Sequence, residues 1–363
     1  MTAPVGFGKP WLASLCVLAL IAARTAPSAA TTFDFCVDVP TLLGGVDYTP
    51  DQIVRRTALA YGLQAALPPG VEPSALHRRP DGSFLFAPSH PITLGGSDYE
   101  PRDLIAWNGV SFTSYLDGEA IGLPEGTRID ALVLDAASRP VMSFDAPVVI
   151  GGTSYGWSDL VRYDSGFSSW FDAAAAGVPA PSNVVGAGID SDGVLVLTFD
   201  SPTRIGPTDY IPGELVSIKG ASFSLYQSNP GWPASAELRD FAFLPPAGAV
   251  PDDDGLPGVP LTLTANKSSL VLSWGAGSCN PGDSDYEVYE GTIGGLFDSH
   301  GPRLCSTGGA TTVTLSPGAG NTYYLVVPRN GVSEGSYGRR SDGSQRPQST
   351  AACLPQVIAS ACR

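Results

Sequence analysis

Four copies of one short phrase constrain the fold of this chain more than any other feature. Each copy places an apolar segment before two turn residues and ends on a tyrosine, and the four tyrosines lie 51, 56 and 55 residues apart. They are Tyr48, Tyr99, Tyr155 and Tyr210. The turn residues are Gly44-Gly45, Gly95-Gly96, Gly151-Gly152 and, in the last copy, Gly206-Pro207. A fixed period of this length indicates one supersecondary unit copied four times.

Each copy contains four short segments in which apolar and polar residues alternate. In the third unit these are Ile129–Leu132, Val141–Asp145, Asp159–Asp164 and Phe167–Asp172. The chain also carries 43 Gly and 33 Pro, enough to separate many short strands, and the best helical segment is only Ala173–Ala176. This pattern predicts an all-β protein.

Four strands in each of four copies predict a small β-propeller over residues 31–248. If Ile129–Leu132 is the innermost strand of a blade, the repeat region begins with a second strand, Phe33–Val39, and ends with a first strand, Leu238–Leu244. These two would share one blade and close the circle, which removes exposed sheet edges. A β-solenoid or tandem sandwiches, the alternatives, would not need this shared blade.

The repeated phrase has a structural interpretation. The glycines suit a turn between the second and third strands of a blade, and each tyrosine can bury its ring between blades. The polar side chain four residues after each tyrosine can bond turn amides at a strand start. A polar ring that binds a cation is the functional alternative. We therefore take as candidate binding residues three of these acids and two inner-strand acids: Asp103, Asp159, Glu214, Asp130 and Asp240.

Composition divides the rest of the chain. Residues 1–30 form a predicted signal peptide, with Lys9 before an apolar run and small residues before Thr31. Residues 249–258 form an acidic Pro/Gly linker, residues 259–353 a β-sandwich and residues 354–363 a tail. The aspartates Asp252–Asp254 are expected to keep the linker in water, or to bind Ca²⁺. No other cofactor is expected.

Charge limits the partners. The chain has a net charge of −15, and cleavage after residue 30 would remove Lys9 and Arg24 but no acid. Such a surface repels nucleic acid, which needs clustered cations. No later segment is apolar enough to span a bilayer. We expect an exported protein, extracellular, on the cell surface or in the periplasm.

The last quarter of the chain resembles a fibronectin type III domain. The resemblance rests on Ser273-Trp274, on Tyr286-x-Val288-Tyr289 and on Thr314–Pro317 followed by Tyr323–Val327. It implies a two-sheet sandwich with the Trp and a later Tyr between the sheets. The segment Gly335–Arg339 is expected to be a further strand.

The repeat region resembles hemopexin-like four-bladed propellers in architecture. In that family the inner strand carries an Asp-Ala pair at the channel mouth. Asp130-Ala131 matches this pair, Ser74-Ala75 and Asp240-Phe241 match in part, and Val185-Gly186 does not. The whole chain is similar to exported bacterial proteins of repeat-plus-sandwich layout.

Five cysteines follow the predicted signal peptide, and in an oxidising compartment they are expected to pair. Cys279 with Cys305, and Cys353 with Cys362, would leave Cys36 unpaired. An alternative joins Cys36 to Cys353 or Cys362.

Catalytic signatures are absent from the sequence. Its three histidines, His77, His90 and His300, form no zinc-binding spacing, and there is no Gly-x-Ser-x-Gly or phosphate-binding glycine loop. Asp190–Gly193 resembles half of a calcium loop but suits a hairpin turn. Trp107, Trp157 and Trp170 are expected to pack in the core rather than to stack on sugars.

We therefore predict a non-catalytic binding or adhesion protein. It would recognise a protein or a glycan through propeller loops, particularly Leu123–Arg128 and Val178–Asn183. One alternative is an extracellular hydrolase with a carboxylate pair in the propeller channel. The other is a passive surface spacer with calcium in its linker.

Overall fold

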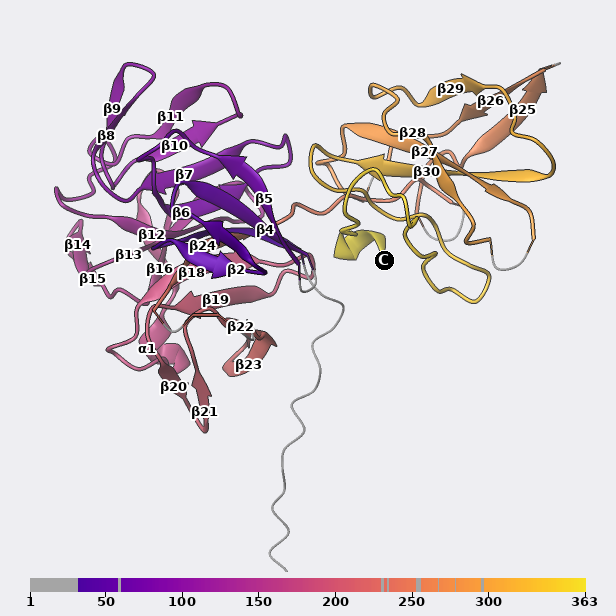
Figure 1. The fold of residues 1–363 in the computed structure, drawn as a ribbon. Coiled ribbons are helices and arrows are strands. Elements are labelled where there is room, and N and C mark those ends of the chain that lie inside the picture. The colour runs from indigo at the N-terminus through magenta and orange to yellow at the C-terminus, as the bar shows by residue number, and fades with distance from the viewer. Residues whose placement is uncertain are drawn as a thin grey trace, which may run out of the picture.

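A computed structural model describes residues 32–57, 60–229, 232–233, 235–252, 256–266, 268–277, 279–294 and 297–363. The predicted signal peptide lies outside these residues, as do Asp253 and Asp254 of the linker. The described chain forms two β domains, a repeat domain and a sandwich (Figure 1).

The repeat domain is a four-bladed propeller-like ring of four-stranded antiparallel sheets. From the axis outward, blade 1 contains β24 (Leu238–Phe243), β1 (Phe33–Val37), β4 (Gln52–Thr57) and β5 (Ala60–Ala66). Blade 2 contains β6 (Pro73–Arg78), β7 (Phe84–Pro88), β10 (Leu104–Trp107) and β11 (Phe112–Leu116). Blade 3 contains β12 (Ile129–Leu134), β13 (Pro140–Phe144), β16 (Leu160–Tyr163) and β17 (Phe167–Phe171). Blade 4 contains β18 (Val184–Ile189), β19 (Leu195–Phe199), β22 (Leu215–Lys219) and β23 (Ser222–Gln227).

The two ends of the repeat region share blade 1, as the sequence predicted. Strand β1 pairs antiparallel with β24, with Phe33 opposite Phe243 and Phe35 opposite Phe241. In Figure 1 the indigo strands from the start of the described chain accordingly lie beside β24. The all-β class and the closed circle are confirmed, and α1 (Ala173–Ala176) is a single helical turn capped by Asp172.

The repeated phrase forms a small hairpin between the second and third strands of every blade. In the first three hairpins both turn glycines have positive φ, for example 59° and 85° at Gly44 and Gly45. This is the signature of a type I′ turn, which glycine adopts without strain. In the fourth, only Gly206 has positive φ, because Pro207 fixes its own φ near −65°. The hairpins are β2–β3 (Thr41–Leu43, Val46–Tyr48), β8–β9 (Ile92–Leu94, Ser97–Tyr99), β14–β15 (Val148–Ile150, Thr153–Tyr155) and β20–β21 (Thr203–Ile205, Thr208–Tyr210).

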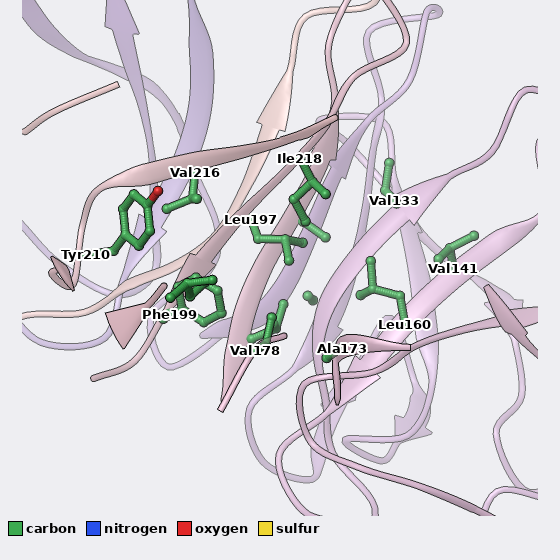
Figure 2. Packing of buried hydrophobic residues seen from close by; sticks show 14 residues of the cluster. Val133, Val141, Leu160, Ala173, Val178, Leu197, Phe199, Tyr210, Val216 and Ile218 are labelled. Atoms are coloured by element: carbon green, nitrogen blue, oxygen red, sulfur yellow. The ribbon is translucent and has the colours of Figure 1, made fainter. Parts of the chain in front are cut away.

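Each tyrosine of the phrase packs in one of four apolar cores, and each core lies between two successive blades. Tyr210 packs with Leu197 and Phe199 of blade 4 against Val141 and Leu160 of blade 3. Figure 2 shows this core, with side chains from both blades facing one another. Tyr48, Tyr99 and Tyr155 are buried in the three equivalent positions. Within the described residues no sheet spans two blades, so the blades are joined by this packing together with individual hydrogen bonds, such as that from the Ile129 N–H to the Pro101 carbonyl.

The second domain is a β-sandwich of two three-stranded sheets. Trp274, Tyr286 and Tyr324 fill its core, and the Trp and Tyr286 rings meet edge to face at 5.5 Å. One sheet has the order β25 (Thr262–Asn266), β26 (Ser269–Ser273), β29 (Thr312–Leu315). The other has the order β28 (Gly301–Leu304), β27 (Asp285–Thr292), β30 (Thr322–Arg329). The predicted strand at Gly335–Arg339 does not form, because Ser336 turns away and its N–H bonds the carbonyl of Gly248.

The tail and the described part of the linker pack against the sandwich. Ala247 and Ala249 are buried, Ala247 pairs with Ile358, and the short 3₁₀ helix η1 (Ser360–Cys362) follows. The expectation of a solvated spacer is therefore wrong for Ala249 and Pro251, which are buried, whereas Pro257 and Gly258 are exposed as expected.

The cysteine pairing differs from both predicted schemes. The disulfides are Cys279–Cys362 and Cys305–Cys353, and Cys36 is a free thiol buried in β1. The predicted pairs neglected that the tail folds back onto the domain, which brings Cys362 to within 5.5 Å of Cys279 between Cα atoms.

Two buried carboxyl groups share hydrogen bonds inside the sandwich. The Tyr289 hydroxyl lies 2.7 Å from an oxygen of Glu287 and 2.7 Å from an oxygen of Glu334. Tyr337 and Gln348 donate to the second oxygen of Glu334. One hydroxyl proton cannot serve two carboxylates, so one carboxyl group must carry a proton. Burial, followed by the nearby Glu334, raises the pKa of Glu287 to about 9.

Candidate functional site

A single carboxylate on the propeller axis joins the inner strands of all four blades. One oxygen of Asp240 accepts the N–H groups of Leu76 and Leu132, at 2.8 and 2.7 Å. The other accepts those of Ala187 and Phe241, at 3.0 and 2.8 Å. These amides belong to β6, β12, β18 and β24, so Asp240 bonds to every blade.

The inner strands are shaped for this bonding. At the same position in each inner strand, one residue has no partner residue on the second strand of the blade. These residues are Ser74, Asp130, Val185 and Asp240. Such a β-bulge re-aims the local backbone and side chain. Burial raises the pKa of Asp240, and its four amide bonds oppose that rise.

The axis is filled rather than open at this level. Opposite inner strands β12 and β24 approach within 8 Å between Cα atoms. A Cβ atom at Gly186 would lie 2.7 Å from Thr198 and 3.1 Å from Phe241, and a Cβ atom at Gly188 would lie 2.7 Å from Phe241. The missing Asp-Ala match in β18 thus has a physical reason, since glycine leaves room for the Phe241 and Phe243 rings.

The second inner-strand acid, Asp130, is also buried and bonded. One oxygen accepts from the Ser143 hydroxyl at 2.7 Å, and the other accepts from the Asn183 amide at 3.0 Å. Burial raises its pKa to about 7, although both hydrogen bonds oppose the change. Asp130 therefore joins blade 3 to the start of blade 4 and has the proton affinity of a weak general acid.

The three remaining candidate acids hold turns in their own blades. Asp103 accepts from the N–H groups of Glu100 and Gly118, and Asp159 accepts from those of Gly156 and Ala173. Glu214 accepts from the Ile211 N–H. The side chains thus bond amides in the turns before a strand, as the structural interpretation predicted, and Asp103 and Asp159 also bond the Gly118 and Ala173 amides that follow one. Within the described ranges, no three His, Cys, Asp or Glu side chains are grouped to hold a metal ion.

A cleft of about 800 Å³ lies at the opposite end of the inner strands from these bulges. All four inner strands contribute their final residues, and the two turns of blades 3 and 4 form its walls. The floor is apolar, formed by Val133, Ile189, Phe243 and Leu244, and Trp170 of β17 lies on one side. This volume and lining are those of a ligand-sized site.

Charged side chains surround this apolar floor. Asp135 ends β12 and accepts the Arg139 Nε–H at 2.8 Å, and Arg139 also reaches Asp164 at 2.9 Å. Arg162 lies 4.0 Å from the same Asp135 carboxylate. Burial opposes ionisation of Asp135, but the hydrogen bonds from Arg139 and Ala137 and the charge of Arg139 lower its pKa overall. The pairs present donors and acceptors at fixed positions beside Trp170.

Two further basic residues, Arg78 and His77, lie at the blade 2 side of this channel-end cleft. Arg78 stacks over the Phe84 ring at 4.0 Å and lies 3.9 Å from Asp34, and burial lowers its pKa to about 10. His77 is neutral at pH 7, because burial lowers its pKa to about 4. The positive charge of the cleft is thus carried by guanidinium groups, beside the carboxylates of Asp135 and Asp190.

The wall of blade 4 is tied to the second domain. The turn Asp190–Gly193 is a hairpin turn in which Asp190 accepts from Asp192 and Val194, as predicted. Arg363 bonds Asp192 at 2.7 Å and the Ser191 hydroxyl at 2.8 Å. Since the Cys279–Cys362 disulfide holds the neighbouring residue, the sandwich positions one edge of the cleft.

The predicted binding loops lie elsewhere. Leu123–Arg128 and Val178–Asn183 precede β12 and β18, so they lie at the bulge end of the channel, whereas the cleft lies where these strands end. Among the tryptophans, Trp107 stacks on Phe84 and Phe112 in the core, as expected. The sequence interpretation missed Trp170 as a cleft residue, because its β-strand pattern resembles that of Trp107.

No protein-family model matches this chain, and no curated protein matches it. Among solved structures it is similar to the extracellular domain of a protein described as a hybrid two-component system, BT3049 of B. thetaiotaomicron. The identity is 10%, the match covers 78% of this chain and 40% of that one, and the TM-score is 0.24. It is also similar to the corresponding domain of BT4673, with 10% identity, 92% and 57% coverage and a TM-score of 0.28. A Lactobacillus plantarum protein matches with 10% identity, 91% and 98% coverage and a TM-score of 0.24.

The chain spans less than two thirds of the two Bacteroides structures. TM-scores of this size describe a loose resemblance, so these proteins indicate no function for this chain. None of the helices in the described ranges is both long and apolar enough to cross a bilayer. The fold and the cleft define an all-β protein of a four-bladed propeller and a disulfide-bonded sandwich.

Proposed function

We propose that this chain is a non-catalytic, exported binding protein whose ligand site is the channel-end cleft. The observation that carries this proposal is the convergence of four inner-strand ends on one apolar floor beside Trp170. Rigid blades fix the position of these residues, which suits recognition. Two disulfides support export, because such bonds persist in oxidising compartments. The strand order of the sandwich supports membership of the fibronectin type III class.

A glycan is the ligand that this cleft fits best. An aromatic ring can stack on a sugar face, while the Asp135–Arg139 pair offers an acceptor and donors to hydroxyl groups. An apolar floor with few polar groups at its rim is the usual composition of a small-ligand site. A peptide segment with an aliphatic side chain is the competing ligand class.

A glycan array followed by titration calorimetry tests this proposal. We expect Trp170→Ala to weaken binding of any glycan hit at least tenfold, because stacking and apolar contact are lost together. Trp157→Ala is the matched control, since Trp157 is equally half-buried but lies outside the cleft. Equal binding by both variants would contradict the assignment of the cleft. Binding of peptides alone would replace the glycan by a protein partner.

One observation favours a second function, a hydrolase using channel carboxylates. Asp130 has a pKa of about 7, as a general acid requires. Its two oxygens are nevertheless occupied by Ser143 and Asn183, and Asp240 bonds four amides. Turnover of glycoside or ester substrates that Asp130→Asn abolishes, with unchanged thermal stability, would favour this alternative over the binding protein.

A further inference from the structure

One edge of the sandwich lacks the strand that would complete it. Strand β30 pairs with β27 on one side along its whole length. On its other side only the end is bonded, where the Gly335 N–H bonds the Pro328 carbonyl and Arg329 bridges Glu334. After Ser336 the chain leaves this edge, so the segment expected to be a strand does not cover it.

The backbone groups of this edge can be assigned from the ladder. The Asn321 carbonyl accepts the Ile293 N–H and so faces β27, whereas the Pro328 carbonyl accepts the Gly335 N–H and faces the opposite side. Because alternate residues of an antiparallel strand face opposite neighbours, the N–H and C=O groups of Tyr324 and Val326 face away from β27. Neither backbone has a hydrogen-bond partner among the described residues. Both residues are nevertheless buried as a whole, at 8% and 6% exposure.

A groove of about 410 Å³ runs along this edge. Its lining is mainly apolar where it meets the sandwich, with Val250, Pro251, Leu261 and the β30 edge. A strand occupies about 160 Å³ per residue, from a rise of ~3.3 Å, a strand spacing of ~4.8 Å and a sheet spacing of ~10 Å. The β30 groove therefore has room for two to three residues of an added strand.

The rim of the β30 groove carries two arginines on a strongly acidic protein. Arg339 has neither an ion pair nor a side-chain hydrogen bond in the described chain, and Arg346 makes only a 3.5 Å bond to the Phe297 carbonyl and a contact with its ring. On a chain whose net charge is −15, and with Asp252 as the acid in the described lining, these two guanidinium groups select a partner with carboxylates.

We propose that the β30 groove binds an extended acidic segment of a partner protein, which adds to β30 as a further strand. Backbone hydrogen bonds to Tyr324 and Val326 would supply affinity, alternate side chains would enter the apolar groove, and carboxylates would meet Arg339 and Arg346. An unpaired edge of this kind is otherwise an aggregation hazard that proteins cover. This proposal is independent of the channel-end cleft, which lies in the other domain.

The test uses the full exported chain and two synthetic octapeptides, one alternating valine with glutamate and one alternating valine with lysine. We expect the glutamate peptide alone to bind, and to slow hydrogen exchange at the Tyr324 and Val326 amides. Arg339→Glu is expected to weaken its binding about tenfold. Arg340→Glu is the matched control, because Arg340 neighbours Arg339 but points to Asp298 at 3.9 Å outside the groove; it should change binding less than twofold.

A backbone variant gives a second measurement. Val326→Pro removes an edge N–H that makes no bond to β27. Peptide binding should therefore be lost, while the sandwich remains folded and still shows a thermal unfolding transition. If neither peptide protects the two amides at millimolar concentration, the proposal is wrong. If both peptides bind equally, the acidic specificity is wrong. If protection of the two amides increases with protein concentration in the absence of peptide, the edge binds a second copy of this chain and the proposal is wrong.

Discussion

Replacing Asp240 by asparagine should loosen the propeller more than any other single isosteric change. The side chain keeps its shape but exchanges one acceptor oxygen for an NH₂ group. In either orientation, this group faces two amide donors, either those of Leu76 and Leu132 or those of Ala187 and Phe241. Two buried N–H groups then lose their acceptor.

The magnitude follows from the number of orphaned donors. Each buried donor without a partner costs about 1–3 kcal/mol, so two cost about 2–6 kcal/mol. Removing a buried charge recovers part of this, and we expect a net loss of about 2–4 kcal/mol. Since domains unfold with about 5–15 kcal/mol, this is a large fraction of the stability.

Urea unfolding followed by circular dichroism measures the effect. With a urea slope of about 2 kcal/mol per molar, the midpoint of the propeller transition should fall by about 1–2 M. Asp47→Asn is the control, because Asp47 is exposed and should change stability by less than about 0.5 kcal/mol. If Asp240→Asn unfolds at the same urea concentration as this control, the axial carboxylate does not hold the blades together.

Three further predictions concern the rest of the molecule. The sandwich should lose stability as pH rises from about 5 to 9, because the folded Glu287 holds its proton up to a pKa of about 9 whereas the unfolded group releases it near 4.5. Glu287→Gln should remove this pH dependence. Thermal melts of both proteins at pH 5.5 and 8.5 test this, and the same pH dependence in both would contradict it. Substituting serine for both Cys305 and Cys353 should lower the stability of the sandwich by about 4 kcal/mol, because the disulfide closes a loop of 48 residues, and calorimetry can measure this loss. Non-reducing peptide maps of the unchanged protein should find these two cysteines joined. Gly188→Leu should destabilise the propeller by about 1–3 kcal/mol, since its side chain would collide with Phe241; an unchanged midpoint would show that the ring has room to move.

The propeller could be predicted because its information is local and repeated. The phrase ending at Tyr155 specifies a turn, a strand start and an inter-blade contact within a few residues, and four copies give the period. Even the shared blade followed from counting strands on either side of Ile129–Leu132. The shared blade pairs the two ends of the repeat region, with β5 (Ala60–Ala66) as its outer strand.

The disulfides and the cleft depend instead on contacts that sequence spacing does not encode. Cys362 meets Cys279 because the tail returns along Ala247, a contact between distant segments. Asp240 was selected among the candidate acids, but its bonds to three other strands arise only when the ring closes. Trp170 of β17 and Arg139, which follows β12, lie in different parts of blade 3, and the alternation of apolar and polar residues cannot show that they line one cleft.

The pairing of β1 with β24 closes the ring of four blades, and hydrogen exchange measured by mass spectrometry tests this closure directly. Peptides covering residues 33–37 and 238–243 should be protected as strongly as those covering β12 and β18, and should open together with them as denaturant is added. Fast exchange in residues 33–37 while β12 and β18 stay protected would contradict a closed circle of four blades.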